Sequence, residues 1–166
     1  MRVLVTAASK YGATEEIARV VADTIADAGH EVTVVPAGEV SDVEAHDAFV
    51  VGSAVYAGHW MSAARELIAE HGDVLRGKPV WLFSSGPVGE PPKPEQEPVD
   101  VTSMLELSGA RAHQVFSGKL DRSKLRFADK AIVVAMRAPE GDFRDWDEIR
   151  TWADEIARAL SGGAGE

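Results

Sequence analysis

The chain has 166 residues, a length typical of a single domain, and 45% of them are hydrophobic, which is normal for a globular protein with a buried core. It contains no cysteine, which excludes disulfides, thiol nucleophiles, zinc–thiolate sites and iron–sulfur clusters, so any redox chemistry needs a bound organic cofactor. The formal net charge of -10 argues against nucleic acid as a partner and suits either basic partners or plain solubility.

We expect no targeting signal at the start of the chain. Met1 leads directly into an apolar run, without a charged leader and a following apolar segment. No uninterrupted apolar stretch approaches the length of a membrane span. These features predict a cytoplasmic protein, and no metal site is expected.

Hydrophobic periodicity and turn residues predict strands that alternate with helices along the chain. Gly29 and Gly72 are expected to follow the ends of the first two helices, and Asp145 with Glu148 is expected to cap the start of the last one. This alternation predicts an α/β fold, a doubly wound parallel sheet with helices on both faces, in one domain spanning 1–166. The expected strands are 3–5, 31–35, 48–51, 79–83 and 112–116, and the expected helices are 13–28, 61–70, 101–107 and 145–160.

The loop between the first strand and the first helix has the composition of an anion-binding turn. It reads Thr6-Ala7-Ala8-Ser9-Lys10-Tyr11-Gly12-Ala13-Thr14. Free N–H groups at the helix N-terminus and the helix dipole favour negative charge, and Ser9, Thr14 and Thr6 add side-chain donors. The loop lacks the glycine spacing of nucleotide triphosphatases and of dinucleotide-binding folds. We expect a phosphate monoester here, and the alternative is an ordinary polar strand–helix turn.

Two further loops are expected at the same edge of the sheet, after the third and fourth strands. They are Gly52-Ser53-Ala54-Val55-Tyr56-Ala57-Gly58-His59-Trp60 and Ser84-Ser85-Gly86-Pro87-Val88-Gly89. Small residues let a planar ligand approach the backbone, and Tyr56 and Trp60 offer aromatic faces for stacking, unless they only pack in the core. A phosphate at the first loop and a flat ring between the other two describe a mononucleotide with a large heterocycle.

These loops resemble those of a known family. The pattern Ser9-x-x-Gly12-x-Thr14, followed by Ala18 and Val21, resembles the FMN-phosphate signature of the flavodoxin superfamily. Gly52-Ser53-x-x-Tyr56-x-Gly58-His59 with Ser62-Ala63, and Asp145-Trp146 later in the chain, resemble the flavodoxin-like, quinone-dependent protoporphyrinogen oxidases of bacteria. The resemblance extends over nearly the whole length and implies FMN as the cofactor and a five-stranded sheet in the order 2-1-3-4-5.

The resemblance also implies which residues hold the cofactor. The first loop would wrap the FMN phosphate, and the other two would embrace the isoalloxazine with their backbone groups. His59 is a candidate proton donor, against the alternative of an ordinary surface histidine. Glu15 and Glu16 must point away from the phosphate, because they would repel it. The implied cofactor-binding residues are Thr6, Ser9, Lys10, Tyr11, Gly12, Ala13, Thr14, Ser53, Ala54, Val55, Tyr56, Ala57, Gly58, His59, Ser84, Ser85, Gly86, Pro87, Val88 and Gly89.

A basic segment interrupts this acidic chain before the last helix. Residues 119–137 hold six basic and two acidic residues, in an insertion-like stretch at 118–144. On a helical projection, an apolar face lies beside a stripe of Arg126, Lys130 and Arg137. The pattern suits peripheral contact with the inner face of a membrane, or an anionic apolar substrate such as a porphyrinogen, and it is equally compatible with a solvated helix packed on the domain edge.

Three functional hypotheses follow from the sequence and its resemblance. The first is an FMN-dependent oxidoreductase that oxidises protoporphyrinogen and passes the electrons to a quinone. The second is a flavodoxin that carries electrons between redox partner proteins. The third is a flavin-free interaction domain that keeps the fold.

Overall fold

The computed structural model describes residues 1–56, 58–86, 100–120, 131 and 141–163. Its centre is a sheet in which five parallel strands follow the order β2-β1-β3-β5-β6, and this confirms the predicted order 2-1-3-4-5 of the main strands. The strands are β1 (Arg2–Ala8), β2 (Glu31–Pro36), β3 (Ala48–Tyr56), β5 (Val80–Ser85) and β6 (Ala112–Phe116).

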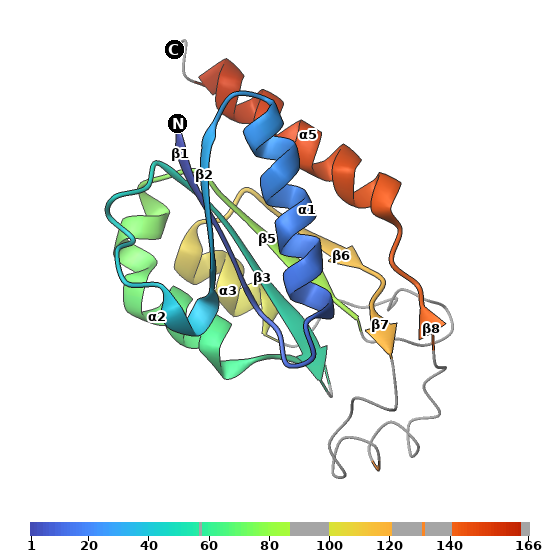
Figure 1. Ribbon diagram of the computed structural model, residues 1–166. Coiled ribbons are helices and arrows are strands. Elements are labelled where there is room, and N and C mark those ends of the chain that lie inside the picture. The colour runs from blue at the N-terminus through green and yellow to red at the C-terminus, as the bar shows by residue number, and fades with distance from the viewer. Residues whose placement is uncertain (57, 87–99, 121–130, 132–140, 164–166) are drawn as a thin grey trace.

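Helices cover both faces of the sheet (Figure 1). α1 (Ala13–Asp27) and α5 (Trp146–Gly163) pack on one face, while α2 (Ser62–Arg76) and α3 (Val101–Ser108) pack on the other, and a 3-10 turn, η1 (Ala37–Glu39), follows β2. Side chains alternate along each strand, so Val3 and Val5 join the core under α1 and α5, and Leu4 joins the core under α2 and α3. The sheet is therefore buried on both faces, as its continuous apolar strands predicted.

α1 forms where helical spacing predicted it. Ile17, Val21 and Ile25 recur on one face, and all three are fully buried against the sheet. Each such side chain contributes about 1.5–3 kcal/mol on burial. Gly29, with a φ of 101°, follows the helix and donates its N–H to the carbonyl of Ala26 at 2.9 Å, so the predicted termination is confirmed.

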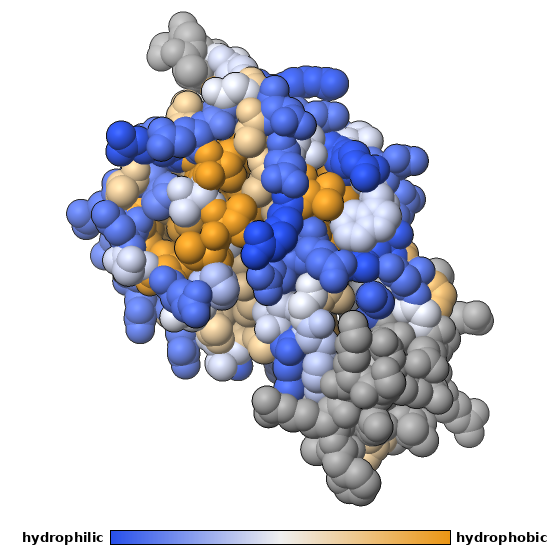
Figure 2. Space-filling model, in the orientation of Figure 1, coloured by the Kyte–Doolittle hydropathy of each residue, from blue (hydrophilic) through white to orange (hydrophobic). Residues whose placement is uncertain are grey.

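The exposed side of this layer is polar along α1 and apolar beside it. Figure 2 shows a hydrophilic stripe along α1, with apolar surface next to it over the sheet edge where β2 runs. Val32 and Val34 of β2 and Val20 of α1 are only partly buried against the core. Glu31 and Thr33 on the same edge strand are exposed and polar, a composition that discourages edge-to-edge pairing.

α2 is longer than the sequence indicated. We expected a helix over 61–70 with Gly72 beyond its end; the helical dihedrals do break at His71, and a second helical segment then continues to Arg76. Gly72 is buried against α3, where a Cβ would lie 2.9 Å from the carbonyl oxygen of Leu107. The predicted end at residue 70 therefore coincides with this break, while Gly72 lies at the start of the second segment, where it allows α2 and α3 to approach closely.

β3 also extends further than expected. It continues from Ala48 to Tyr56, through a stretch that we predicted to be loop after residue 51. Gly52 lies within the strand, and a Cβ at this position would overlap the ring of Phe83 on the neighbouring strand β5. The glycine therefore marks a close packing contact inside the sheet rather than the end of the strand.

Two short antiparallel strands, β7 (Lys119–Leu120) and β8 (Gly141–Asp142), lie at the base of the insertion-like stretch. The N–H of Phe143 donates to the carbonyl of Gly118 at 3.1 Å and extends this ribbon. The predicted basic helix with Arg126, Lys130 and Arg137 lies outside the described residues, so its contact with a membrane or substrate stays a prediction. Within the described part of the chain, no helix is both long and apolar enough to cross a membrane.

Candidate functional site

Three loops leave the sheet at nearly the same level. Ala8 of β1 pairs with Ser53 of β3, and Ser53 pairs in turn with Ser84 of β5. This row lies at or near the carboxyl ends of three adjacent parallel strands, which is where open α/β sheets bind ligands. The register therefore brings together the loops that the sequence singled out.

The β1–α1 turn exposes the start of a helix. Gly12 precedes α1 with a φ of 88° and a ψ of -12°, and no side chain caps this end. The first intrahelical hydrogen bond runs from the N–H of Glu16 to the carbonyl of Gly12, at 3.1 Å, so the earlier N–H groups lie outside the helical ladder. The N–H of Gly12 donates to the hydroxyl of Ser9 at 3.0 Å, which leaves the Ser9 proton available to an acceptor.

Thr14, in the first turn of α1, adds a hydroxyl at this end. The residue is only 2% exposed, and none of the described residues gives its hydroxyl a hydrogen-bond partner. A threonine hydroxyl can donate one hydrogen bond, so this one is available to an acceptor at the helix N-terminus. Space is also open above the turn, because a Cβ built on Gly12 would meet nothing within 4 Å.

The two acidic residues of the first turn are held away by arginines. Glu15 pairs with Arg19 at 3.1 Å on the exposed face of α1, and Glu16 accepts from Arg144 at 2.8 Å. The expectation that both carboxylates are directed elsewhere agrees with these contacts. Their charges are thus compensated beside a helix N-terminus that attracts anions.

Thr6 lies within β1 rather than in the turn. It pairs with Val35 on one side and with Val51 on the other, and its hydroxyl is buried without a partner among the described residues. Strand alternation places Thr6 on the same face as Leu4 and Ala8, toward the core under α2. Its predicted part in phosphate binding stays a prediction.

The second loop is a tight hairpin. β3 turns back into β4 (His59–Trp60), so that Val55 pairs with Trp60 in antiparallel register, and Gly58 has a φ of 81° in the turn. Trp60 is only 1% exposed, and its indole N–H donates to the hydroxyl of Ser84 at 2.7 Å. The expectation that Trp60 offers a face for stacking is wrong, because its ring is packed in the core under α2.

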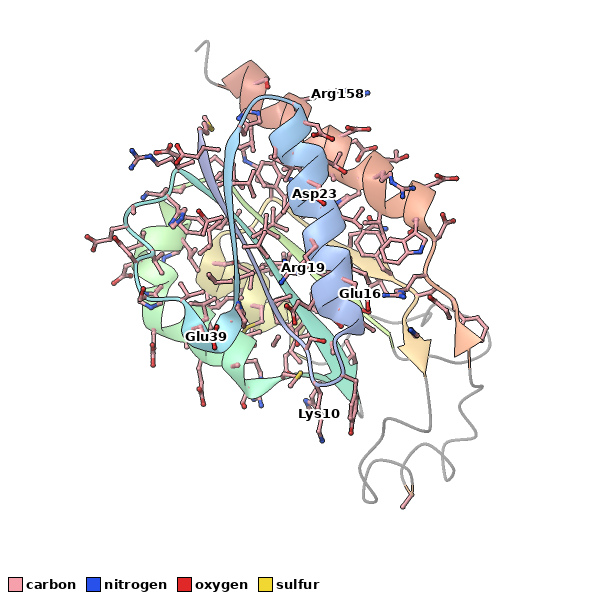
Figure 3. All side chains as sticks on the ribbon, viewed as in Figure 1. Lys10, Glu16, Arg19, Asp23, Glu39 and Arg158 are labelled. Carbon is pink, nitrogen blue, oxygen red and sulfur yellow. The ribbon has the colours of Figure 1, made fainter. Side chains whose placement is uncertain are left out.

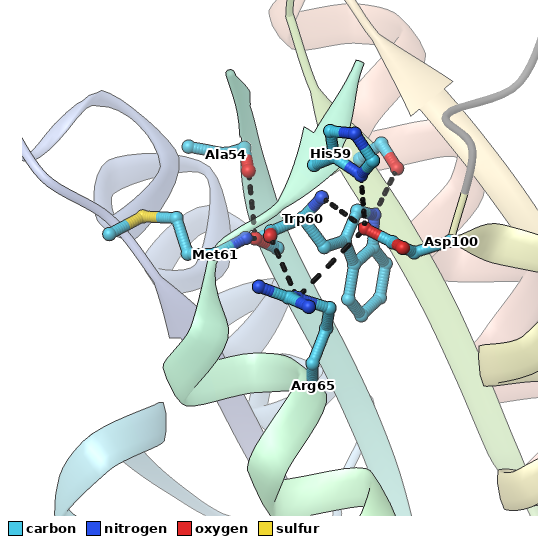
Figure 4. A network of polar contacts seen from close by, with 8 residues as sticks. Ala54, His59, Trp60, Met61, Arg65 and Asp100 are labelled. Carbon is cyan, nitrogen blue, oxygen red and sulfur yellow. Dashed lines mark hydrogen bonds and ion pairs between the residues drawn. The ribbon is translucent and has the colours of Figure 1, made fainter. Parts of the chain in front are cut away.

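A single carboxylate fastens this hairpin to the two helices behind it (Figure 4). Oδ2 of Asp100, just before α3, accepts from the N–H of Trp60 at 3.1 Å and from Nδ1 of His59 at 3.2 Å. Arg65 of α2 lies 3.9 Å from the same oxygen and donates to the carbonyl of Trp60 at 3.1 Å. The Asp100 side chain is 19% exposed, whereas that of His59 is 53% exposed.

The hydroxyls of Ser53 and Ser84, two of the predicted site residues, make hydrogen bonds within the protein. Ser53 donates to the carbonyl of Ala54 at 2.8 Å and accepts from the N–H of Met61 at 2.9 Å, which fixes the entry into α2. Ser84 lies between the Trp60 indole and Nε2 of His113, which is 2.6 Å away. These side chains are therefore engaged inside the protein, and their backbones carry the loops.

The third loop begins at Gly86, which has a φ of 80° and donates its N–H to the carbonyl of Phe116 at 3.0 Å. Ser85 before it is buried at the end of β5. Four of the predicted site residues lie outside the described residues, namely Ala57, Pro87, Val88 and Gly89.

Sequence reasoning missed three residues that organise the site: Asp100, Arg65 and Arg144. The available signals were weak. Asp100 directly precedes a predicted helix, a position that favours aspartate, and Arg144 stands beside the Asp145-Trp146 pair. No sequence spacing relates Asp100, Arg65 or Arg144 to the loops, because these residues come close to the loops only in the folded protein.

The fold and the converging loops define a flavodoxin-like α/β protein. The model of the flavodoxin domain family matches residues 4–147, so the chain belongs to this family. The chain is similar to protoporphyrinogen IX dehydrogenase [quinone] of Escherichia coli (strain K12), with 26% identity over 174 residues and 95% of each chain covered.

Solved structures agree on the fold. A flavodoxin from the domain Archaea aligns with a TM-score of 0.64 at 17% identity, covering 97% of this chain and 99% of its own. Oxidised flavodoxin 1 from Bacillus cereus aligns with a TM-score of 0.62 at 16% identity, covering 95% of this chain and 98% of its own.

Proposed function

We propose that the chain binds FMN, with the phosphate at the β1–α1 turn. The observation that carries the proposal is the uncapped start of α1, where the hydroxyl of Thr14 has no partner among the described residues. The open space above Gly12 and the engaged carboxylates of Glu15 and Glu16 fit a dianionic group. The free N–H groups at the start of α1 and the hydroxyls of Ser9 and Thr14 would donate hydrogen bonds to the phosphate.

The isoalloxazine would lie between the β3–β4 hairpin and the loop that starts at Gly86. Gly58 and Gly86 have positive φ angles, which favour glycine, and because glycine has no side chain the backbone is open to a ligand at these two positions. The Trp60–Ser84 hydrogen bond and the Asp100 carboxylate hold the two loops from behind. When bound, FMN supplies electron or hydride transfer.

We propose protoporphyrinogen oxidation with a quinone acceptor as the reaction. Support comes from the match over 95% of both chains to the protoporphyrinogen IX dehydrogenase [quinone] of Escherichia coli. His59 is our candidate for proton transfer, because it is exposed at the hairpin and donates through Nδ1 to Asp100. Its Nε2 has no partner among the described residues, so it is free to face a substrate.

FMN titration tests the cofactor. The expected result is tight binding by the purified chain and a flavin absorbance spectrum when the ligand copurifies. A Thr14→Val variant should weaken FMN binding by about fivefold, as expected for a lost hydrogen bond. Thr24→Val is the matched control, because Thr24 lies in the same helix and donates to the carbonyl of Val20 at 2.8 Å. Absence of FMN binding by the wild-type chain would favour the flavin-free interaction domain.

A second candidate is an electron-carrying flavodoxin. Its support is the alignment with two flavodoxins over nearly their whole lengths, and the acidic surface implied by a net charge of -10 suits docking to basic redox partners. Steady-state assays with protoporphyrinogen IX and a soluble quinone distinguish the two. Turnover by the FMN-loaded chain supports the enzyme, and electron delivery to a partner protein without porphyrinogen turnover supports the carrier.

A further inference from the structure

A buried arginine contacts the start of α1 from a distant part of the sequence. The Arg144 side chain is 4% exposed. Its Nη1 donates to Glu16 at 2.8 Å and to the carbonyl of Ala13 at 3.2 Å. Its Nη2 and Nε donate to the two carboxylate oxygens of Asp142, at 2.7 Å and 2.9 Å. One guanidinium therefore joins β8 to the first turn of α1.

Several contacts fix the orientation of Arg144. Its guanidinium lies 4.5 Å from the centre of the Trp146 ring, within the range of a cation–π contact. Asp145 caps α5 by accepting from the N–H of Glu148 at 3.1 Å, and this fixes the backbone beside it. The hydrogen bond with Asp142 raises the pKa of Arg144 further above its ordinary value, so the side chain stays charged.

The ion pairs of Glu15 and Glu16 differ in how exposed the arginine is. Arg19 is 63% exposed beside Glu15, where water screens the pair, while Arg144 is buried beside Glu16. Figure 3 shows Glu16, Arg19 and Asp23 along α1, with Lys10 at the turn before it. Without Arg144, the carboxylates of Glu16 and Asp142 would add uncompensated negative charge near the helix N-terminus.

We propose that Arg144 is a positioning residue that makes the site selective for phosphorylated flavin. It does so by neutralising Glu16 and by holding the Ala13 carbonyl, and thus the first turn of α1, in place. The inference rests on the proposed binding of FMN. It assigns Arg144 a part in distinguishing FMN from riboflavin, which has the same ring without the phosphate.

Titration of FMN and riboflavin into the full-length, flavin-free chain tests this, with flavin fluorescence as the readout. Arg144→Gln should weaken FMN binding by about five- to thirty-fold, the range of a charge effect at a helix terminus, and leave riboflavin binding nearly unchanged. Arg144→Lys should weaken FMN binding less than Arg144→Gln does, because lysine keeps the positive charge although it lacks the planar guanidinium group. Glu16→Gln should tighten FMN binding by up to about fivefold. Arg19→Gln is the matched control and should change both affinities by less than about twofold.

The outcomes separate the two proposals. A wild-type chain that binds no FMN overturns the proposed function and this inference together. If the wild type binds FMN but Arg144→Gln weakens both flavins by the same factor, Arg144 is only structural and the inference is overturned. Should Arg144→Gln fail to fold, Glu16→Gln decides, and an unchanged ratio of FMN to riboflavin affinity overturns the inference.

Discussion

The indole N–H of Trp60 donates a 2.7 Å hydrogen bond to the hydroxyl of Ser84, and both residues are buried. Nε2 of His113 lies 2.6 Å from the same hydroxyl, so three polar groups on β4, β5 and β6 form one chain through the core. These hydrogen bonds connect β4 of the hairpin with β5, the strand that leads into the third loop.

Trp60→Phe should destabilise the fold by about 1–3 kcal/mol, because it leaves the buried Ser84 hydroxyl without one partner. Urea unfolding at neutral pH measures the change. Trp152→Phe is the control for the loss of ring size, since Trp152 is buried but its indole has no acceptor among the described residues. Equal losses in the two variants would show that the hydrogen bond contributes nothing.

Gly52→Ala should destabilise the chain by about 1–3 kcal/mol, because its methyl group would overlap the Phe83 ring inside the sheet. Thermal unfolding is the measurement. Gly162→Ala in α5 should instead be neutral or slightly stabilising, since nothing lies within 4 Å of a Cβ there. A Gly52→Ala protein as stable as the wild type would contradict the packing described for β3 and β5.

Asp100→Ala should loosen the β3–β4 hairpin, because the N–H of Trp60 and Nδ1 of His59 lose their shared acceptor. Hydrogen exchange of the Trp60 amide should accelerate by about tenfold, the equivalent of a lost hydrogen bond. Asp73→Ala is the control, since Asp73 is an exposed partner of Arg76 in α2. Unchanged exchange at Trp60 would argue against the carboxylate as the fastening point.

Acid stability should depend on Asp142 and Asp47. The hydrogen bonds from Arg144 hold the pKa of Asp142 below its ordinary value of 3.8, and the Arg2 N–H does the same for the pKa of Asp47. Both carboxylates therefore stabilise the fold at pH above 3.8, and this contribution is lost as the pH falls through their lowered pKa values.

The double variant Asp47→Asn/Asp142→Asn tests this dependence. Its free energy of unfolding, from urea titrations at successive pH values, should be lower than that of the wild type near neutrality. It should then fall less steeply on acidification. Parallel curves for the two proteins below pH 3.8 would contradict the assignment.

Local patterns were enough to predict the layers. Apolar spacing in α1 and the continuous apolar strands gave the α/β alternation, since each element must bury one face or both. The structural roles of the glycines were predicted less well. Gly29 ends a helix as predicted, whereas Gly72 and Gly52 mark close packing, and only the neighbours at Leu107 and Phe83 distinguish these cases.

Strand and helix periodicity and turn composition are local properties, and they were enough to predict the fold class and the neighbourhood of the three loops, although β1, β3 and β5 each continue into the stretches that were expected to be loop. Three contacts could be seen only in the folded protein: Trp60 is packed in the core, Asp100 accepts hydrogen bonds from the β3–β4 hairpin, and Arg144 reaches Glu16 across 128 residues of sequence. These contacts join segments far apart in the chain. Their partners are chosen by how the layers pack around the sheet, which no local pattern records.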